Sequence, residues 1–344
     1  MLGRAEEFQR EGFVVSPEAV LSPEAVDACR AHLARVLDGV YDRNVPPTKA
    51  PKKLDLSKLD KNDKRRRATL QVINIRHCDS VFQRVVHSPE LGKLVATLAG
   101  WPQGARVAQD QIWMKPPGAA ALTFHRDTPY FPFVPGQIVT LWVTFDDLSG
   151  PDAAEKGPLE YYPGSHRWED GRNGIATYFF DKDHTAHLRS AAERTDGVEY
   201  DPARIVRVVT PAGGISVHDG RTWHGSGVNK SALPRRGIGI HFAPADIVFR
   251  PGWIPPQWEA VRAKYNAQLN EGARPEAAST AVAAEAETKR HMPENTPAPR
   301  SEGDAATSEG DAAPPADSEA AVPDPTVPES ECPITYRPGS AASD

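Results

Sequence analysis

The feature that most constrains the fold is a series of short strand-like runs between about residue 105 and residue 245. The runs are rich in β-branched and aromatic residues, and turns containing proline and glycine separate them. They read RVAQDQIWM, QIVTLWVTF, PLEYY, ARIVRVV, GISVH and GIGIHFA. Many short strands after a helical beginning predict a mainly β fold, a β-sandwich or jelly roll with helices packed outside.

One of these runs shows which side of the sheet faces the interior. Along residues 138–145, Val139, Leu141 and Val143 alternate with Thr140 and Trp142. Successive side chains on a strand point to opposite faces of the sheet. The apolar face therefore predicts a core, and the mixed polar and aromatic face predicts the wall of a lumen.

Helical patterns precede the strands. Ser22-Pro23 and Ser88-Pro89 combine a capping residue with a proline at the first helical position. The first pair begins an amphipathic pattern that continues to about Val40, and a second helical region extends from about Asp79 to Gly100. We expect one domain over residues 1–270, with a helical part at about 1–100 and a jelly-roll part at about 101–258.

The last 74 residues differ in composition. Residues 271–344 contain 15 Asp or Glu against 5 Lys or Arg, 11 prolines and a single aromatic residue, Tyr336. Such a segment buries too little apolar area to offset the entropy lost on ordering. We predict a disordered acidic tail outside the fold.

Composition also limits the partners and the location. The net charge is −6 and no sustained basic face is present, which argues against a nucleic-acid protein. No apolar run reaches the roughly 20 residues of a membrane helix, the N-terminus does not resemble a signal peptide, and Cys29, Cys78 and Cys332 show no disulfide pattern. We expect a cytoplasmic protein, monomeric or weakly homo-oligomeric, that contacts neither membrane nor nucleic acid.

A possible metal site lies among the strands. His125 and Asp127 stand at positions i and i+2, so on a strand both side chains would point to one face. A facial ferrous site needs two histidines and one carboxylate, which leaves coordination positions open. The second histidine is His224, ahead of a glycine-rich turn. His218, six residues earlier, is the alternative.

The strand that follows supplies a cation. On GIGIHFA and the two residues before it, Arg235, Gly237, Gly239 and His241 share one face. Two glycines would leave space beside an arginine that can hold a carboxylate through a two-pronged pair. A slip of one residue would replace Arg235 by Arg236 on this face.

Together these motifs resemble a known family. HRDTPYFPF, LEYYPGSH and WHGSGVN, followed by Arg235 and HFAPAD, resemble the phytanoyl-CoA hydroxylase family of iron(II) and 2-oxoglutarate-dependent dioxygenases, over roughly residues 6–258. The resemblance implies a double-stranded β-helix, a cupin-like jelly roll with flanking N-terminal helices. It implies Fe(II) with 2-oxoglutarate and O2 as cosubstrates, and decarboxylation to succinate coupled to hydroxylation, or a related C–H oxidation, of a small molecule.

The resemblance also assigns residues. His125, Asp127 and His224 match the iron ligands and catalytic centre, and Arg235 matches the partner of the distal carboxylate of 2-oxoglutarate. The further cosubstrate contacts that it implies are Ser226, Trp142, Gln111 and Gln71. Asp127 stands where related halogenases have a small residue, so the chain resembles a hydroxylase.

Several features keep two interpretations. Residues 43–67 carry ten Lys or Arg and form either a solvated loop or an attractor for an anionic substrate such as an acyl-CoA. Tyr130, Phe131 and Phe133 line either the pocket or the core. His166 is predicted to be a turn residue, and His184 and His187 to be solvated. The alternative to an enzyme acting on an acyl-CoA or a natural-product intermediate is a non-catalytic jelly-roll protein that binds metal and recruits partners.

Overall fold

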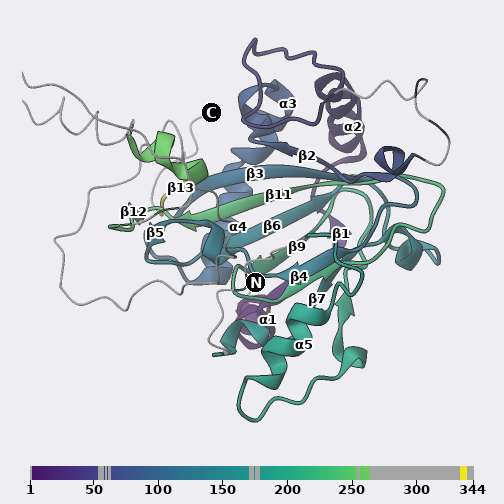
Figure 1. Cartoon of the computed structure of the whole chain (residues 1–344). Coiled ribbons are helices and arrows are strands. Elements are labelled where there is room, and N and C mark those ends of the chain that lie inside the picture. The colour runs from purple at the N-terminus through teal and green to yellow at the C-terminus, as the bar shows by residue number, and fades with distance from the viewer. Residues whose placement is uncertain are drawn as a thin grey trace, which may run out of the picture. The chain divides into compact units, whose positions relative to one another are not determined.

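The computed structural model describes residues 2–52, 58, 60, 63–169, 174, 179–252, 254, 256–263 and 334–338. Four of its helices belong to the first hundred residues, α1 (Leu2–Glu11), α2 (Pro23–Leu37), α3 (Ser80–Val86) and α4 (Pro89–Ala99) (Figure 1). The hydroxyl groups of Ser22 and Ser88 accept backbone N–H groups of the first turns of α2 and α4, and Gly100 ends α4 in the left-handed conformation. Both predicted helical regions are confirmed, the second as two helices.

Two antiparallel sheets form the body. The larger has the order β1-β9-β6-β11-β3-β13, with β2 also paired to β3, and the smaller has the order β4-β10-β7-β8. The larger contains β1 (Phe13–Ala19), β2 (Leu70–Ile73), β3 (Ala105–Lys115), β6 (Val139–Thr144), β9 (Gly214–Asp219), β11 (Arg235–Pro244) and β13 (Ile334–Tyr336). The smaller contains β4 (Leu122–His125), β7 (Leu159–Tyr161), β8 (Val206–Arg207) and β10 (His224–Ser226), and β5 (Phe133–Val134) pairs separately with β12 (Val248–Phe249). The predicted fold class, a jelly roll with flanking helices, is confirmed.

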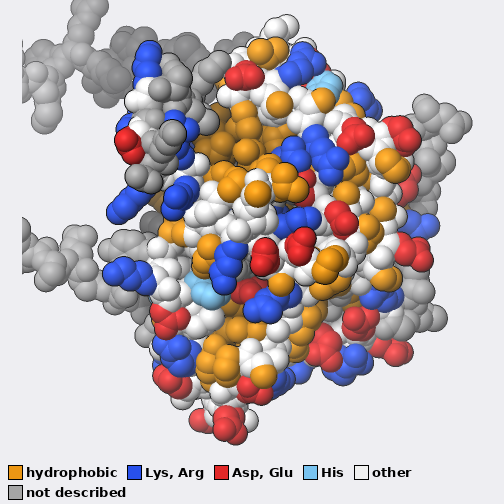
Figure 2. All heavy atoms as spheres, turned by 90° about the vertical axis from the view of Figure 1, so that its right-hand side faces the viewer, with side chains coloured by type: hydrophobic (Ala, Val, Ile, Leu, Met, Phe, Trp, Pro, Cys, Tyr) orange, Lys and Arg blue, Asp and Glu red, His pale blue; other side chains and the backbone are white. Residues whose placement is uncertain are grey.

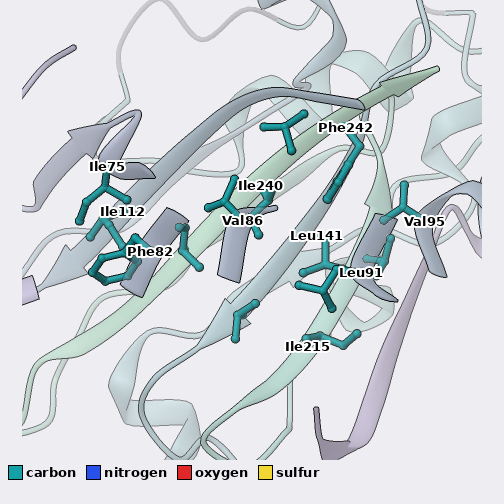
Figure 3. Packing of buried hydrophobic residues seen from close by; sticks show 14 of the residues in the cluster. Ile75, Phe82, Val86, Leu91, Val95, Ile112, Leu141, Ile215, Ile240 and Phe242 are labelled. Carbon is teal, nitrogen blue, oxygen red and sulfur yellow. The ribbon is translucent and has the colours of Figure 1, made fainter. Parts of the chain in front are cut away.

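The two faces of the larger sheet carry different side chains, as the alternation predicts. Val139, Leu141 and Val143 of β6 and Ile238 and Ile240 of β11 belong to one buried apolar cluster. That cluster lies between the sheet and the helices, where Figure 3 shows Phe82 and Val86 of α3 and Leu91 and Val95 of α4 against strand residues. The opposite face lines the lumen with Gln109, Gln111, Trp113, Lys115, Thr140, Trp142, Ser216, His218, Arg235 and His241, which are in register across β3, β11, β6 and β9.

The structure differs from the expected division of the chain at three places. The part expected to be helical also supplies β1, which pairs with β9, and β2, which pairs with β3. The expected tail is not wholly outside the fold, because β13 pairs with β3 and Thr335 is buried. The rest of the segment 271–344 lies outside the described residues.

The chain between β6 and β8 contains regular structure in its described residues. Besides β7 it forms α5 (Ala186–Glu193), and Leu188 and Ala191 of that helix pack beside Phe124 of β4. Short 3-10 helices in the chain cover Lys64–Arg67, Ile75–His77, Thr128–Tyr130, Ala153–Lys156, Ser165–Arg167, Pro202–Arg204 and Pro256–Trp258.

The basic stretch 43–67 forms, in its described residues, a loop that ends in the 3-10 helix Lys64–Arg67, with one isolated bridge between Lys49 and Ile73. Figure 2 shows a face of the molecule on which Lys and Arg side chains are mixed with Asp and Glu around hydrophobic side chains. Among the described helices, none is long and apolar enough to span a membrane.

Candidate functional site

The jelly roll brings together two histidines and a carboxylate that are far apart in the sequence. His125 ends β4, His224 begins β10, and the two are directly paired across these antiparallel strands. Asp127 Oδ1 lies 3.7 Å from His125 Nε2 and 3.5 Å from His224 Nε2. All three residues are buried, and they form a group that could hold a metal ion.

Asp127 reaches this group by a different route from the expected one. The strand ends at His125, and Asp127 lies in the following turn with helical backbone angles. Its backbone N–H donates to the carbonyl oxygen of Gly220 at 2.7 Å. The i, i+2 rule for a strand is therefore the wrong reason for the proximity of His125 and Asp127, which comes from a turn anchored beside β9.

The tautomers of both histidines are fixed by backbone carbonyl groups. Nδ1 of His125 lies 2.9 Å from the carbonyl oxygen of Thr123, and Nδ1 of His224 lies 2.9 Å from that of Thr222. A carbonyl oxygen only accepts, so each Nδ1 is the donor and each Nε2 is left to face Asp127. Metal-ligating histidines have this arrangement, in which one ring nitrogen is oriented by the protein and the other is free.

The two carboxylate oxygens of Asp127 have different partners. Oδ1 faces His125 and His224, and Oδ2 is hydrogen-bonded to other side chains. Oδ2 accepts from Thr140 Oγ1 at 2.6 Å and from His218 Nε2 at 3.0 Å. Thr140 Oγ1 is in turn 2.8 Å from Nδ1 of His241, which donates to it because the hydroxyl hydrogen points at Asp127. His218, the alternative second ligand, thus contacts the outer carboxylate oxygen, and its Nδ1 is 3.1 Å from the hydroxyl of Tyr161.

The electrostatics of the cluster favour a cation at its centre. Burial and, next, the neighbouring His224 lower the pKa of His125 to about 3. Burial alone would raise the pKa of Asp127, but His224, His241 and the hydrogen bond from His218 hold it well below its usual value. Burial would likewise lower the pKa of His224, yet the Asp127 carboxylate raises it. An ionised carboxylate between imidazole nitrogens is a donor set that fits a divalent ion such as Fe(II).

A cationic end of the lumen lies along the same strands. Arg235 is buried, its Nε donates to the carbonyl oxygen of Gly157 at 3.2 Å, and its guanidinium lies 5.1 Å from the ring centroid of Trp142. Arg236 faces the other way, where Asp146 binds its guanidinium at 2.6 Å. Of the two arginines, Arg235 is the one in the lumen.

The predicted free space beside Arg235 is partly filled. A Cβ at Gly237 would lie 2.2 Å from the Trp142 ring, whereas a Cβ at Gly239 would meet it only at 3.6 Å. Gly237 therefore accommodates the Trp142 indole instead of leaving a gap. The indole Nε1 of Trp142 and Nη1 of Arg235 are buried and have no hydrogen-bond partner within the described part of the chain.

The remaining predicted cosubstrate contacts also face the lumen. Ser226 is buried on β10 and its hydroxyl accepts from Nζ of Lys115 at 3.0 Å. Gln71 donates to Gln111 at 2.9 Å, and Lys49 of the basic stretch donates to Gln71 at 3.2 Å. Gln111 is opposite Gly239 in the register of β3 and β11. A polar chain thus extends from the basic stretch to the lumen wall.

Aromatic rings border the group on its other side. Phe179 and Tyr130, both half-buried, lie 5.2 Å and 6.4 Å from the His125 ring, centroid to centroid. Phe131 lies 5.1 Å from His241, while Phe133 packs on Phe249 and Trp258. Tyr130 and Phe131 therefore border the site, and Phe133 belongs to an apolar cluster beside it.

Two further histidines lie apart from the group. Nε2 of His166 lies 3.2 Å from the carbonyl oxygen of Gln9, and its ring packs against Gly12, in agreement with a structural turn residue. His184 is not simply solvated, because it is partly buried and its Nε2 lies 3.1 Å from Glu160.

The sequence analysis did not identify three lumen residues as partners of the site. They are Lys115, Thr140 and His241. Thr140 and His241 were on faces recognised as lumen-facing, so the alternation of β6 and β11 could have identified them. Lys115 gives no such signal, because its position in the lumen follows from its register with Arg235 on the partner strand.

Known proteins share this sequence pattern. Residues 8–237 match the family model for phytanoyl-CoA dioxygenase (PhyH). A probable alpha-ketoglutarate-dependent hypophosphite dioxygenase of Stutzerimonas stutzeri is 29% identical over 164 residues, 47% of this chain and 52% of that protein. The peroxisomal phytanoyl-CoA dioxygenase of Homo sapiens is 29% identical over 187 residues, 49% of this chain and 47% of that protein. The chain thus matches about half the length of these curated relatives.

Solved structures share the fold. The non-heme alpha-ketoglutarate-dependent carbocyclase SnoK from nogalamycin biosynthesis superposes with a TM-score of 0.56 at 24% identity, over 76% of this chain and 90% of that one. EctD from S. alaskensis superposes with a TM-score of 0.52 at 19% identity, over 75% and 82% of the two chains. These likenesses support the jelly roll, and the family match spans most of the described fold. The chain belongs to the phytanoyl-CoA dioxygenase family.

Proposed function

We propose that the protein is an Fe(II)/2-oxoglutarate-dependent oxygenase that hydroxylates, or otherwise oxidises at a C–H bond, a small-molecule substrate. The observation that carries the proposal is the buried pair of Nε2 atoms facing Oδ1 of Asp127, with both Nδ1 atoms committed to carbonyl groups. Two imidazoles and one carboxylate leave open positions on a ferrous ion. The family membership and the names of the relatives support the same chemistry.

The residues have distinct roles in this proposal. His125, Asp127 and His224 would hold Fe(II), which when bound supplies the redox chemistry that couples 2-oxoglutarate and O2 to substrate oxidation. Thr140 and His218 orient the carboxylate by holding its other oxygen. Arg235 and Ser226 would bind the distal carboxylate of 2-oxoglutarate, with Trp142 as a wall of the pocket and Gln111 and Gln71 at its polar side.

The spacing along β10 suits this cosubstrate. His224 and Ser226 are two residues apart on one strand and both are buried. A strand rises about 3.4 Å per residue, so the two positions are about 7 Å apart. A five-carbon dicarboxylate is short enough to extend between a metal held by His224 and a carboxylate pocket beside Ser226.

The substrate would enter beside His125, along the half-buried rings of Tyr130 and Phe179, whose centroids lie 6.2 Å apart. An apolar, ring-lined approach favours an organic substrate such as a natural-product intermediate or an acyl-CoA chain. Asp127 supplies a carboxylate where related halogenases have a small residue, which favours hydroxylation as the outcome.

An anaerobic titration tests the proposal. Metal-free protein is titrated with Fe(II) and 2-oxoglutarate, and the visible charge-transfer band of the chelated keto acid is recorded. We expect a band in the wild type, none in His224→Ala, a weaker band in Arg235→Ala, and an unchanged band in His187→Ala, whose histidine lies on α5 outside the cluster. Folded wild-type protein that binds iron without developing the band would exclude the oxygenase and leave a non-catalytic metal-binding protein.

A further inference from the structure

Two cations face each other in the lumen. Lys115 of β3 and Arg235 of β11 are direct partners in the antiparallel register, and their exposed fractions are 1% and 2%. Directly opposite residues have Cβ atoms about 5 Å apart, and like charges there destabilise a sheet. A fold that retains both groups in its interior must either keep one of them neutral or place an anion beside them.

The described part of the chain does not supply that anion. Glu160, the carboxylate that raises the pKa of Lys115, is bound by His184 and by Arg207, each at 3.1 Å. Asp146, the carboxylate that raises the pKa of Arg235, is bound by the backbone and side chain of Arg236. Among the ion pairs of the described residues, neither Lys115 nor Arg235 takes part.

The hydrogen bonds of Lys115 satisfy the neutral amine but not the protonated one. Its Nζ donates to Ser226 Oγ at 3.0 Å and to the carbonyl oxygen of Gly227. A neutral amine has two N–H donors, which these two acceptors satisfy, whereas an ammonium has three. The third donor has no acceptor among the described residues. Because Ser226 Oγ accepts from Lys115, its own hydrogen is free to point toward a ligand.

We propose that Lys115 is a positioning residue for the distal carboxylate of 2-oxoglutarate, neutral in the empty pocket and protonated when the dicarboxylate enters beside Arg235 and Ser226. The inference rests on the proposed function and adds a residue to its pocket. Lys115 orients the Ser226 hydroxyl toward the carboxylate, and its third N–H becomes an ion-pair donor. Binding of 2-oxoglutarate then takes up a proton from the solvent.

The titration behaviour of Lys115 agrees with this geometry. Burial and, next, the adjacent Arg235 lower the pKa of Lys115 to about 6, while Glu160 of β7 acts weakly in the opposite direction. A carboxylate placed between Lys115 and Arg235 favours the charged form and raises the pKa. Between these two pKa values the affinity for 2-oxoglutarate falls as the pH rises, by up to about tenfold per pH unit, because one proton must be bound.

Calorimetric titration tests the inference without measuring turnover. Fe(II)-loaded protein is titrated anaerobically with 2-oxoglutarate at pH 8 in two buffers that differ in ionisation enthalpy. We expect the wild type and Lys93→Met, which changes an exposed lysine on α4, to take up close to one proton. Lys115→Met should take up none and bind at least tenfold more weakly. Lys115→Arg stays charged, so it should bind without proton uptake.

The outcomes separate the inference from the function on which it rests. A wild type that does not bind 2-oxoglutarate contradicts the proposed function. A wild type that binds it with no proton uptake, and with the same affinity from pH 6.5 to 8.5, overturns the role of Lys115 and leaves the function intact. This second result needs no variant, so it decides the question even if Lys115→Met does not fold. Equal proton uptake in the wild type and Lys115→Arg would also overturn the role.

Discussion

The two ends of the lumen differ in how their buried charges are balanced. At one end the Asp127 carboxylate is surrounded by four histidines, His125, His218, His224 and His241, and one of its oxygens accepts from Thr140 and His218. At the other end Lys115 and Arg235 face each other without a carboxylate within the described chain. The first end is held in place by the protein itself, and in our proposal the second is completed by the distal carboxylate of 2-oxoglutarate.

The difference suggests two kinds of preorganisation. A metal site has to present its ligands in a fixed geometry before the ion arrives, and outer hydrogen bonds provide that. A pocket for an anion is instead kept electrostatically unbalanced, because the imbalance is the driving force for binding. Variants at the two ends should therefore differ in what they do to the protein without ligands.

The largest expected effect follows from removing the carboxylate. Asp127→Ala deletes the one anionic ligand of the group, so iron affinity should fall by more than about 100-fold, beyond the 10- to 100-fold typical of outer-shell partners. Equilibrium dialysis with Fe(II) under anaerobic conditions measures this. Asp219→Ala, which changes a carboxylate that binds Arg221 nearby, is the matched control. Retained iron affinity in Asp127→Ala would show that the metal is bound elsewhere.

The next effect concerns the unbalanced end. Arg235→Met removes a buried cation from the proposed carboxylate pocket, which should cost about 2–5 kcal/mol of 2-oxoglutarate binding, at least 30-fold in affinity. The same change should leave the free energy of unfolding of the ligand-free protein equal or higher, since an unpaired buried charge disappears. Calorimetric binding and urea unfolding measure the two quantities.

A free energy of unfolding that is lower in ligand-free Arg235→Met than in the wild type would break the comparison between the ends. Arg236→Met is the matched control for the arginine. It removes the partner of Asp146 on the other face of β11, so it should lower stability and leave 2-oxoglutarate affinity unchanged.

A smaller effect is expected from the layer around the carboxylate. Thr140→Val removes the hydroxyl that donates to Oδ2 of Asp127 at 2.6 Å and accepts from His241. Asp127 keeps its bond from His218, so the geometry loosens without losing a ligand. Iron affinity should fall by about 10- to 100-fold. Thr144→Val, on the same face of β6 but bonded to the carbonyl oxygen of Asp146, should leave it unchanged.

Much of this site could be predicted from the sequence because strands reveal their faces by alternation. The assignments of Thr140 and Trp142 to the lumen, of Val139 and Leu141 to the core, and of Arg235 rather than Arg236 to the lumen agree with the structure. The spacing of the histidines and the carboxylate identified a group that the structure brings together.

Other features could not be predicted, for identifiable physical reasons. Lys115 stands before a Pro-Pro-Gly turn and reads as a surface lysine, because burial of a lysine depends on a partner strand that its neighbours do not reveal. Pro17 obscures β1, since proline is rare inside strands. The composition of residues 271–344 is dominated by acidic and proline residues, and an average over them conceals the three residues of β13.

The pH dependence of stability separates the two ends further. The pKa of Lys115 is lowered to about 6 in the folded protein, below its ordinary value of 10.5. Between these values the unfolded chain binds more protons than the folded one, so Lys115 makes stability rise with pH, by at most about 1.4 kcal/mol per pH unit. This contribution should be absent in Lys115→Met and smaller when 2-oxoglutarate is bound. Urea unfolding at pH 6.5, 7.5 and 8.5 gives the slopes, and identical slopes for wild type and variant would contradict a buried neutral lysine.

The smallest expected effect concerns β13, which pairs with the first residues of β3. It tests whether this strand affects the two charged ends of the lumen. Thr335 and Tyr336 of β13 pack against Gly92 of α4 and Gly104, and a Cβ at Gly92 would lie 2.4 Å from Thr335 Oγ1. Gly92→Ala should therefore destabilise the full chain. In a chain ending at residue 323 the obstacle is gone, and the same change should stabilise by up to about 1 kcal/mol, since alanine favours a helix over glycine. The opposite signs form a double-mutant cycle whose coupling measures the docking of β13. Additive effects would mean that β13 does not pack there, and a change in iron or 2-oxoglutarate affinity on truncation would show that the strand acts on the site.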